Sequence, residues 1–156
     1  MTRYGALQAR IRAMDAMRLE KSYRLVPREL SIEYSAYESC LQRFVHPDKG
    51  DIVGRDALLK RSEAGENWQL VTMEVHGVKD ADARGSEPIY LGDELVGRAT
   101  SGGYGWRVER SLVLAMAPPK LASIGTELSI SILGESYKVT VIEESPFDAG
   151  NKRLRG

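Results

Sequence analysis

Cysteine is almost absent from this sequence, since Cys40 is the single cysteine among 156 residues. No disulfide can form within the chain, and a reducing compartment, the cytoplasm, is the simplest location to expect. An excess of charge of one sign is also missing, because 22 lysine and arginine residues balance 22 aspartate and glutamate residues. A neutral chain is not expected to attract nucleic acid or an anionic membrane. Charged residues interrupt every apolar run before it reaches the length of a membrane span, so no membrane attachment is expected.

The familiar motifs of catalysis are missing as well. The sequence has no phosphate-binding loop, no dinucleotide fingerprint and no Gly-x-Ser-x-Gly nucleophile frame. Its two histidines, His46 and His76, are far apart in the sequence, and neither belongs to a nucleophile motif. Asp48 and Asp51 follow His46, but their spacing matches no metal-binding template, which favours turn carboxylates. No catalytic residue and no metal ligand are therefore assigned.

The first part of the chain has helical periodicity. Apolar residues recur at spacings of three and four within residues 4–24, at Leu7, Ile11, Met14 and Met17. A stripe of this kind usually faces a core, and we expect that here. Because the sequence begins inside the stripe, a missing upstream partner is the alternative, and it predicts exposed apolar surface at Leu7, Ile11 and Met14. Shorter helices are expected at residues 37–44 and 54–64.

Glycine is concentrated in residues 96–106, where three glycines fall within four residues between two apolar runs. Glycine permits a positive φ and the close approach of another group to the backbone. The stretch therefore predicts a strained loop or a ligand-facing mouth between two strands. A bulged hairpin connection without a ligand is the plainer alternative. Tyr104 and Trp106 place aromatic side chains where turns usually carry small polar ones, which makes this loop the candidate site.

From residue 68 onward, apolar residues alternate with polar ones. The pattern predicts strands at residues 68–75, 88–91, 94–101, 106–117, 125–133 and 137–143. Six strands without an intervening helix indicate a small antiparallel barrel or sandwich. We therefore expect an α+β chain with a helical segment over residues 1–66 and a β domain over residues 67–156. The basic residues 152–155 are interpreted as a solvated chain end.

Several segments resemble the folate-dependent aminomethyltransferase superfamily, and they occur in the same order. They are Met-Arg-Leu-Glu-Lys-Ser-Tyr at 17–23, Glu-Tyr-Ser-Ala-Tyr-Glu at 33–38, Asp-Lys-Gly-Asp-Ile-Val-Gly-Arg-Asp-Ala-Leu at 48–58, Gly-Arg-Ala-Thr-Ser-Gly-Gly-Tyr-Gly at 97–105, Pro-Pro at 118–119 and Pro-Phe-Asp at 146–148. The chain is most similar to the C-terminal region of dimethylglycine and sarcosine dehydrogenases, more than to the glycine-cleavage T-protein itself.

The resemblance implies a C-terminal six-stranded β-barrel that helps to wall a tetrahydrofolate pocket for one-carbon transfer. Residues 1–66 would then be the tail end of the folate-binding aminomethyltransferase domain. In the dehydrogenases, FAD occupies a separate upstream domain that oxidises the N-methyl amine. The family's folate aspartate also lies upstream, so we expect this chain to be inactive alone, and whether it belongs to an enzyme is left open.

Two residues are expected to face the folate. Tyr104 is chosen for its place in the glycine-rich loop, and Arg153 stands where T-proteins have a folate-facing tyrosine. Met14 stands where T-proteins have an arginine that binds the folate carboxylate. The expected partners are upstream domains, a catalytic partner chain, or a second copy through the N-terminal helix. The alternative function is a non-catalytic binding module or subunit that docks onto a separately encoded catalytic chain.

Overall fold

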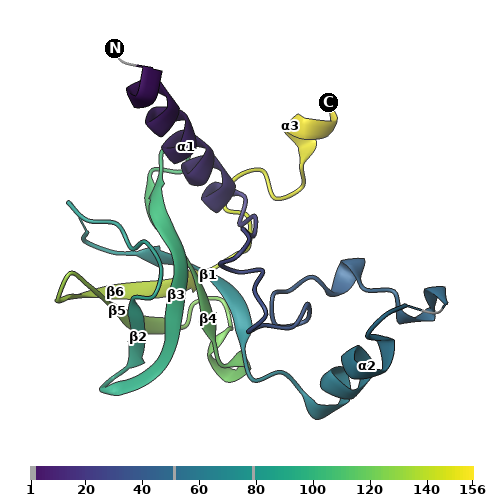
Figure 1. The fold of residues 1–156 in the computed structure, drawn as a ribbon. Helices are drawn as coiled ribbons and strands as arrows, with labels where there is room; N and C mark the ends of the chain where they lie inside the picture. Colours follow the sequence, from purple (N-terminus) through teal and green to yellow (C-terminus); the bar gives the residue numbers. More distant parts are fainter. Residues whose placement is uncertain (1–2, 51, 79) are drawn as a thin grey trace.

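Six antiparallel strands close into a barrel (Figure 1). The computed structural model describes residues 3–50, 52–78 and 80–156, and the side chains within 11–50, 52–78, 80–153 and 155–156. The strands are β1 (Gln69–Val75), β2 (Pro88–Leu91), β3 (Glu94–Gly105), β4 (Arg110–Ala117), β5 (Glu127–Ile132) and β6 (Glu135–Ile142), arranged around the barrel as β1-β4-β3-β2-β5-β6. The expected α+β chain with a six-stranded antiparallel barrel is confirmed, and closure excludes the sandwich.

Strand β4 is buried on both faces and determines where the helical segment packs. Val113, Ala115 and Ala117 belong to the cluster that fills the barrel interior. Leu112, Leu114 and Met116 alternate with them and form a second buried cluster on the outside. A strand buried on both sides has a nearly continuous apolar sequence, as residues 111–117 do. The outer cluster therefore requires a cover, which the segment before the barrel provides.

Helix α1 (Arg3–Glu20) covers part of this outer surface through its C-terminal end (Figure 1). Leu19 is 1% exposed and joins the outer cluster, whereas Ile11, Met14 and Met17 are 59%, 65% and 58% exposed. The expectation that this stripe faces a core is therefore wrong, because the helix uses a different face to contact the barrel. The alternative, exposed apolar surface, is confirmed at Ile11 and Met14. Leu7 lies outside the residues whose side chains are described.

The remaining helical elements are short. Helix α2 (Arg55–Ala64) matches the expected helix, α3 (Lys152–Arg155) is a single turn near the C-terminus, and 3-10 turns occur at Gln42–Phe44, Pro47–Lys49 and Pro119–Leu121. Among the described residues, no helix is both long and apolar enough to cross a membrane. The division of the chain between residues 66 and 67 stays a prediction, with α2 ending at Ala64 and β1 beginning at Gln69.

The helix expected at residues 37–44 does not extend beyond a single turn, because Cys40 has a left-handed backbone conformation. The Ser35 backbone N–H donates to Glu38 Oε2 at 2.8 Å, and the Glu38 N–H donates to Ser35 Oγ at 3.0 Å. This reciprocal pair caps a single turn. Cys40 then has a positive φ of 54°, which ends the turn.

Burial raises the pKa of Glu38, but the Ser35 N–H and the Arg61 guanidinium outweigh it and lower that pKa below its ordinary value of 4.5.

The glycine-rich stretch is not a loop, so that expectation is wrong. Strand β3 continues to Gly105, and the turn of the hairpin lies at residues 106–109. None of Gly102, Gly103 and Gly105 has a positive φ. A β-carbon at Gly102 would lie 2.5 Å from the Ala83 carbonyl oxygen, and one at Gly105 would lie 3.0 Å from Glu20 Cγ. These glycines therefore allow neighbouring segments to approach the strand closely. Close approach is one of the two roles expected for glycine here, and the other, a positive φ, is not observed at these three positions.

Substitution of Gly102 tests this close approach. Gly102→Ala should lower the free energy of unfolding by about 1–3 kcal/mol, because the methyl group collides with backbone that cannot rotate away. Gly150→Ala is the matched control, since a β-carbon there meets only side-chain atoms at 3.7 Å or more. Thermal unfolding of both variants provides the measurement. Equal melting temperatures for the two would contradict the assignment.

The lowered pKa of Glu38 predicts a pH dependence of stability. The folded carboxyl releases its proton at a lower pH than the unfolded one, so the stabilisation is complete above the ordinary pKa and is lost as pH falls through the folded pKa. Glu38→Gln removes this contribution. Denaturant unfolding from pH 3 to pH 7 should show that the stability difference between the native chain and the variant shrinks below about pH 4. A difference that is constant with pH would exclude this linkage.

Candidate functional site

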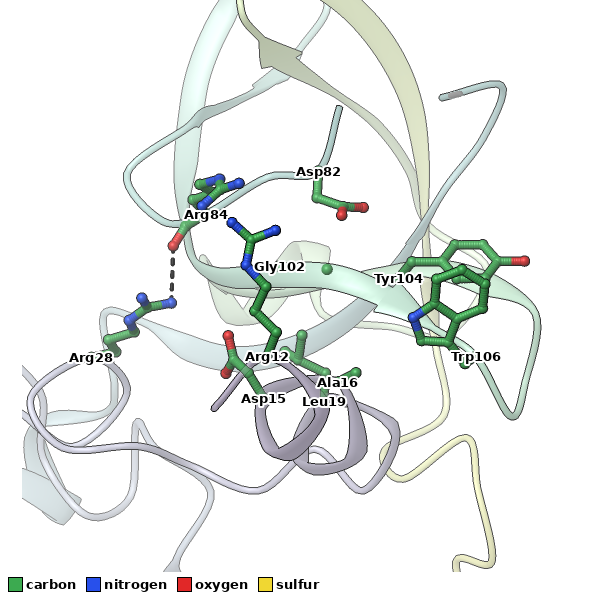
Figure 2. Close-up of a pocket in the computed structure, with 11 residues that line it drawn as sticks. Arg12, Asp15, Ala16, Leu19, Arg28, Asp82, Arg84, Gly102, Tyr104 and Trp106 are labelled. Atoms are coloured by element: carbon green, nitrogen blue, oxygen red, sulfur yellow. Dashed lines mark hydrogen bonds between the residues drawn. The ribbon is translucent and has the colours of Figure 1, made fainter. Parts of the chain in front are cut away.

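A cleft of about 310 Å³ lies where α1, the far half of β3 and the segment around residues 82–84 meet (Figure 2). Gly102 and Gly103 form part of its lining, so the strand presents backbone rather than side chains there. Tyr104 and Trp106 flank the cleft, with ring centroids 4.9 Å apart and an edge-to-face angle of 76°. An aromatic pair of this geometry can bind the face or edge of a flat ligand ring.

The cleft also has a strongly charged lining, with Arg12, Arg28, Arg84, Asp15 and Asp82 around it. The Arg28 guanidinium donates to the Arg84 carbonyl oxygen at 2.9 Å, which joins the segment after α1 to the segment before β2. Asp15 accepts from Arg18 Nε at 2.5 Å and is thereby neutralised. The remaining lining carries more positive than negative charge, which suits an anionic group.

A buried carboxylate holds the strand and the helix on either side of this cleft. Glu29 is 0% exposed, and its Oε1 accepts from Thr100 Oγ1 at 2.6 Å and from Ser101 Oγ at 2.5 Å. Its Oε2 accepts from the Leu25 backbone N–H at 2.9 Å, and Arg18 Nη1 lies 3.6 Å away. We call Glu29, Thr100, Ser101 and Arg18 the Glu29 cluster. A buried carboxylate must be satisfied in this way, because burying an unpaired charge is very costly.

A β-bulge makes this arrangement possible. Successive residues of a strand point to opposite faces, so Thr100 and Ser101 should not reach the same oxygen. The pairing of β3 with β4 shifts between Ala99 and Ser101, which leaves Thr100 as an extra residue. The bulge turns both hydroxyls toward Glu29. The Thr-Ser part of the Thr-Ser-Gly-Gly-Tyr-Gly stretch therefore has a structural role here.

Residues 18–22 fasten α1 to the barrel. Arg18 Nη2 donates to Ser101 Oγ at 2.8 Å, and Glu20 Oε1 accepts from the Arg107 backbone N–H at 2.6 Å. Lys21 Nζ donates to the Asp148 carbonyl oxygen at 2.7 Å, and the Ser22 and Thr72 hydroxyls are 2.8 Å apart. Segments 17–23, 97–105 and 146–148, which carry the resemblance, thus meet in space. Segment 33–38 joins them, because Tyr34 Oη accepts from Arg98 Nε at 2.8 Å.

The structure separates the two residues expected to face folate. Tyr104 is part of the cleft lining, whereas Arg153 is not. Arg153 lies on α3 with its guanidinium 5.4 Å from the centre of the Phe147 ring, and the Arg107 guanidinium lies 5.9 Å from the same ring. Their roles toward folate stay predictions. Asp51 lies outside the described residues, and among those described no group of three or more potential ligands could hold a metal ion.

Sequence reasoning did not identify Glu29 or the three cleft arginines. Glu29 follows Arg28 in a polar stretch, and nothing in the sequence distinguishes a buried glutamate from a solvated one. Arg12 and Arg84 come from segments 72 residues apart that only the fold brings together. The one available signal was the Thr-Ser pair next to the glycines, since hydroxyls in a buried strand require partners.

Comparison with known proteins gives a consistent result. A family model described as the glycine cleavage T-protein C-terminal barrel domain matches residues 69–148. Mouse dimethylglycine dehydrogenase, mitochondrial, is 33% identical over 133 residues, which cover 85% of this chain and 15% of that protein. Aminomethyltransferase of Synechococcus elongatus is 33% identical over 153 residues, which cover 97% of this chain and 40% of that protein. The chain therefore spans less than half the length of these relatives.

A solved structure shares the fold. Glycine cleavage system aminomethyltransferase T from Bartonella henselae superposes with a TM-score of 0.80 at 19% identity. The match covers 88% of this chain and 38% of that one. Because it extends over more residues than the six strands occupy, the likeness includes segments outside the barrel.

The Glu29 cluster can be tested with two serines on adjacent strands. Ser101→Ala should lower the free energy of unfolding by about 1–3 kcal/mol, because Glu29 and Arg18 each lose a buried partner. Ser111→Ala is the control, since the buried Ser111 hydroxyl has no hydrogen-bond partner among the residues that the structure describes. Its removal should be neutral or stabilising. Chemical denaturation gives both values, and a smaller loss for Ser101→Ala than for Ser111→Ala would contradict the assigned role.

Proposed function

Because this chain belongs to the glycine cleavage T-protein C-terminal barrel domain family, we propose that it is the C-terminal portion of a folate-dependent aminomethyltransferase-type protein. Within this group, the whole protein would be of the dimethylglycine or sarcosine dehydrogenase type. In this role, α1 and the barrel help to wall a tetrahydrofolate pocket for one-carbon transfer. The chain is inactive alone, because FAD and the family's folate aspartate belong to domains upstream of the region that it covers.

The observation that carries this proposal is the exposed apolar stripe of α1. Ile11, Met14 and Met17 are each more than half exposed, on a helix whose other face packs on the barrel. Burying a large apolar side chain contributes about 1.5–3 kcal/mol to the free energy of association. Three such side chains on one face of the helix therefore favour a partner that covers them. In the proposed protein, an upstream domain provides that cover.

The cleft residues fit the chemistry of tetrahydrofolate. The molecule has a reduced pterin whose pyrimidine half is planar, an aromatic linker and a glutamate with two carboxylates, and it supplies the amine that accepts the one-carbon unit. Tyr104 and Trp106 offer aromatic surface, and the arginines of the lining offer positive charge. The volume of about 310 Å³ is at the lower end of the range for small-molecule sites. Upstream domains would complete the walls.

The same stripe also supports the second candidate, a subunit that docks onto a separately encoded catalytic chain. The size of the native polypeptide distinguishes the two. An immunoblot of the source cells with an antibody against the barrel should give a band much larger than 17.3 kDa if the chain is part of a multidomain folate enzyme. A band near 17.3 kDa would favour the docking subunit instead.

Tyr104→Ala tests the folate wall directly. In the native-length polypeptide, loss of one aromatic contact should weaken binding of 5-formyltetrahydrofolate by roughly 0.5–1.5 kcal/mol, up to about tenfold. Tyr23→Ala is the control, because Tyr23 is exposed and lies outside the cleft lining. Titration calorimetry measures both. Absence of binding to the unmodified protein, or equal affinities for the two variants, would count against the proposal.

A further inference from the structure

We propose that Arg28 is a positioning residue for the cleft, because its guanidinium holds the turn at residues 82–86 that forms one wall. The inference rests on the proposed function for the identity of the ligand, and it assigns the residue that fixes the shape of that site. Figure 2 shows the Arg28 side chain reaching from the segment after α1 to this turn, where it donates to the Arg84 carbonyl oxygen at 2.9 Å. Asp82 and Arg84 of the turn line the cleft.

The backbone of this turn does not favour the observed conformation by itself. Residues 82–86 belong to the connection between β1 and β2 and to no helix or strand. Ser86 has a positive φ of 77°, which is unfavourable for a residue with a β-carbon, and Gly85 has a φ of 124°. A β-carbon at Gly85 would lie 2.6 Å from the Thr100 carbonyl oxygen. The turn therefore keeps this shape only while contacts with its surroundings hold it.

Hydrogen bonds hold the turn from two sides. On the barrel side, the Ser86 N–H donates to the Ala99 carbonyl oxygen at 2.7 Å. The N–H groups of the two residues before Ser86 each donate to the Glu87 carboxylate at 2.7 Å. On the other side, among the described residues, the Arg28 guanidinium provides the one hydrogen bond between residues 82–86 and the segment before the barrel. Without that bond, the turn is held from the barrel side alone.

Arg28 is itself fixed by its neighbours. Its backbone N–H donates to the Leu25 carbonyl oxygen at 2.9 Å, and the next residue along the chain is the buried Glu29. The Nη1 atom that binds the Arg84 carbonyl oxygen also lies 3.4 Å from Ser101 Oγ, which belongs to the Glu29 cluster. A charged donor forms a stronger hydrogen bond than a neutral one. Arg28 therefore ties the turn to the same cluster that joins α1 to β3.

The shape of the cleft then depends on Arg28. Two of its walls, α1 and β3, are joined by the hydrogen bond from Arg18 to Ser101. The third wall, the turn at residues 82–86, is joined to the segment after α1 through Arg28. When this bond is absent, the turn can leave its position, and a ligand must order it again on binding. Such ordering weakens affinity without the loss of any contact between ligand and protein.

Hydrogen exchange of the ligand-free 156-residue chain tests the position of the turn. Arg28→Gln should accelerate exchange of the amides of residues 84–86 by about tenfold, because these amides exchange when the turn opens. Arg28→Lys keeps a charged donor and should retain most of the protection. Arg55→Gln is the matched control, since the Arg55 guanidinium donates to the Pro47 carbonyl oxygen at 2.7 Å outside the cleft lining. It should leave the turn unchanged. Amides of β4 should keep their rates in all three variants.

Titration of the native-length polypeptide with 5-formyltetrahydrofolate connects the turn to binding. Arg28→Gln should weaken the affinity by about threefold to tenfold, and Arg28→Lys should restore most of it. Because Arg28 also lines the cleft, the exchange measured without ligand is what shows that the effect passes through the turn.

The outcomes separate this role from the proposed function. If Arg28→Gln accelerates exchange of the turn while the folate does not bind the unmodified protein, the positioning role stands and the folate role fails. If the folate binds but Arg28→Gln leaves the turn as protected as Arg55→Gln does, the positioning role is overturned and the folate role stands. Equal acceleration of the turn and of β4 would also overturn it, because Arg28 would then support the whole fold.

Discussion

The buried carboxylate of Glu29 is the interaction on which the arrangement of this chain depends. It accepts hydrogen bonds from two hydroxyls of β3 and from the backbone at Leu25, with the Arg18 guanidinium beside it. Removing the charged partner of a buried ion pair typically costs about 3–5 kcal/mol, and removing a neutral hydrogen-bond partner costs about 1–3 kcal/mol. The Glu29 cluster thereby fixes the helix to the barrel, and the cleft lies between elements that it holds in place.

The glycines of β3 and the outer face of β4 together form the surface on which α1 packs. Leu19 packs on Leu112, Leu114 and Met116 because Gly103, on the neighbouring strand, leaves room for it. The family-like stretches at 17–23 and 97–105 are therefore two sides of one contact. The residue types in these stretches are explained by the packing between the helix and the strand. The cleft that could bind a ligand lies next to this contact.

The barrel could be predicted from the sequence because alternation along a strand is a local property. The alternation predicts all six strands, whereas the order in which they pair around the barrel is seen only in the structure. The glycine-rich stretch was assigned to a loop because glycine is common in turns, and the competing cause, close contact with Ala83 and Glu20, is non-local. Tyr104 is part of the cleft lining, and its role toward folate stays a prediction. Glu29 and Arg84 could not be identified, since their importance depends on partners more than 50 residues away.

The bulge at Thr100 has a consequence for how this strand can change in length. Loops between the strands can gain or lose residues with little effect on the barrel. A deletion at residue 100 would keep Ser101 opposite Leu114, whereas a deletion at residue 102 would exchange the faces of every position from Gly103 to Gly105, because side chains alternate along a strand. In the second case, Tyr104 would point to the side now occupied by Leu19. Thr100 is thus the position at which this strand can lose a residue without a change of faces, whereas residues 101–105 form a segment of fixed length.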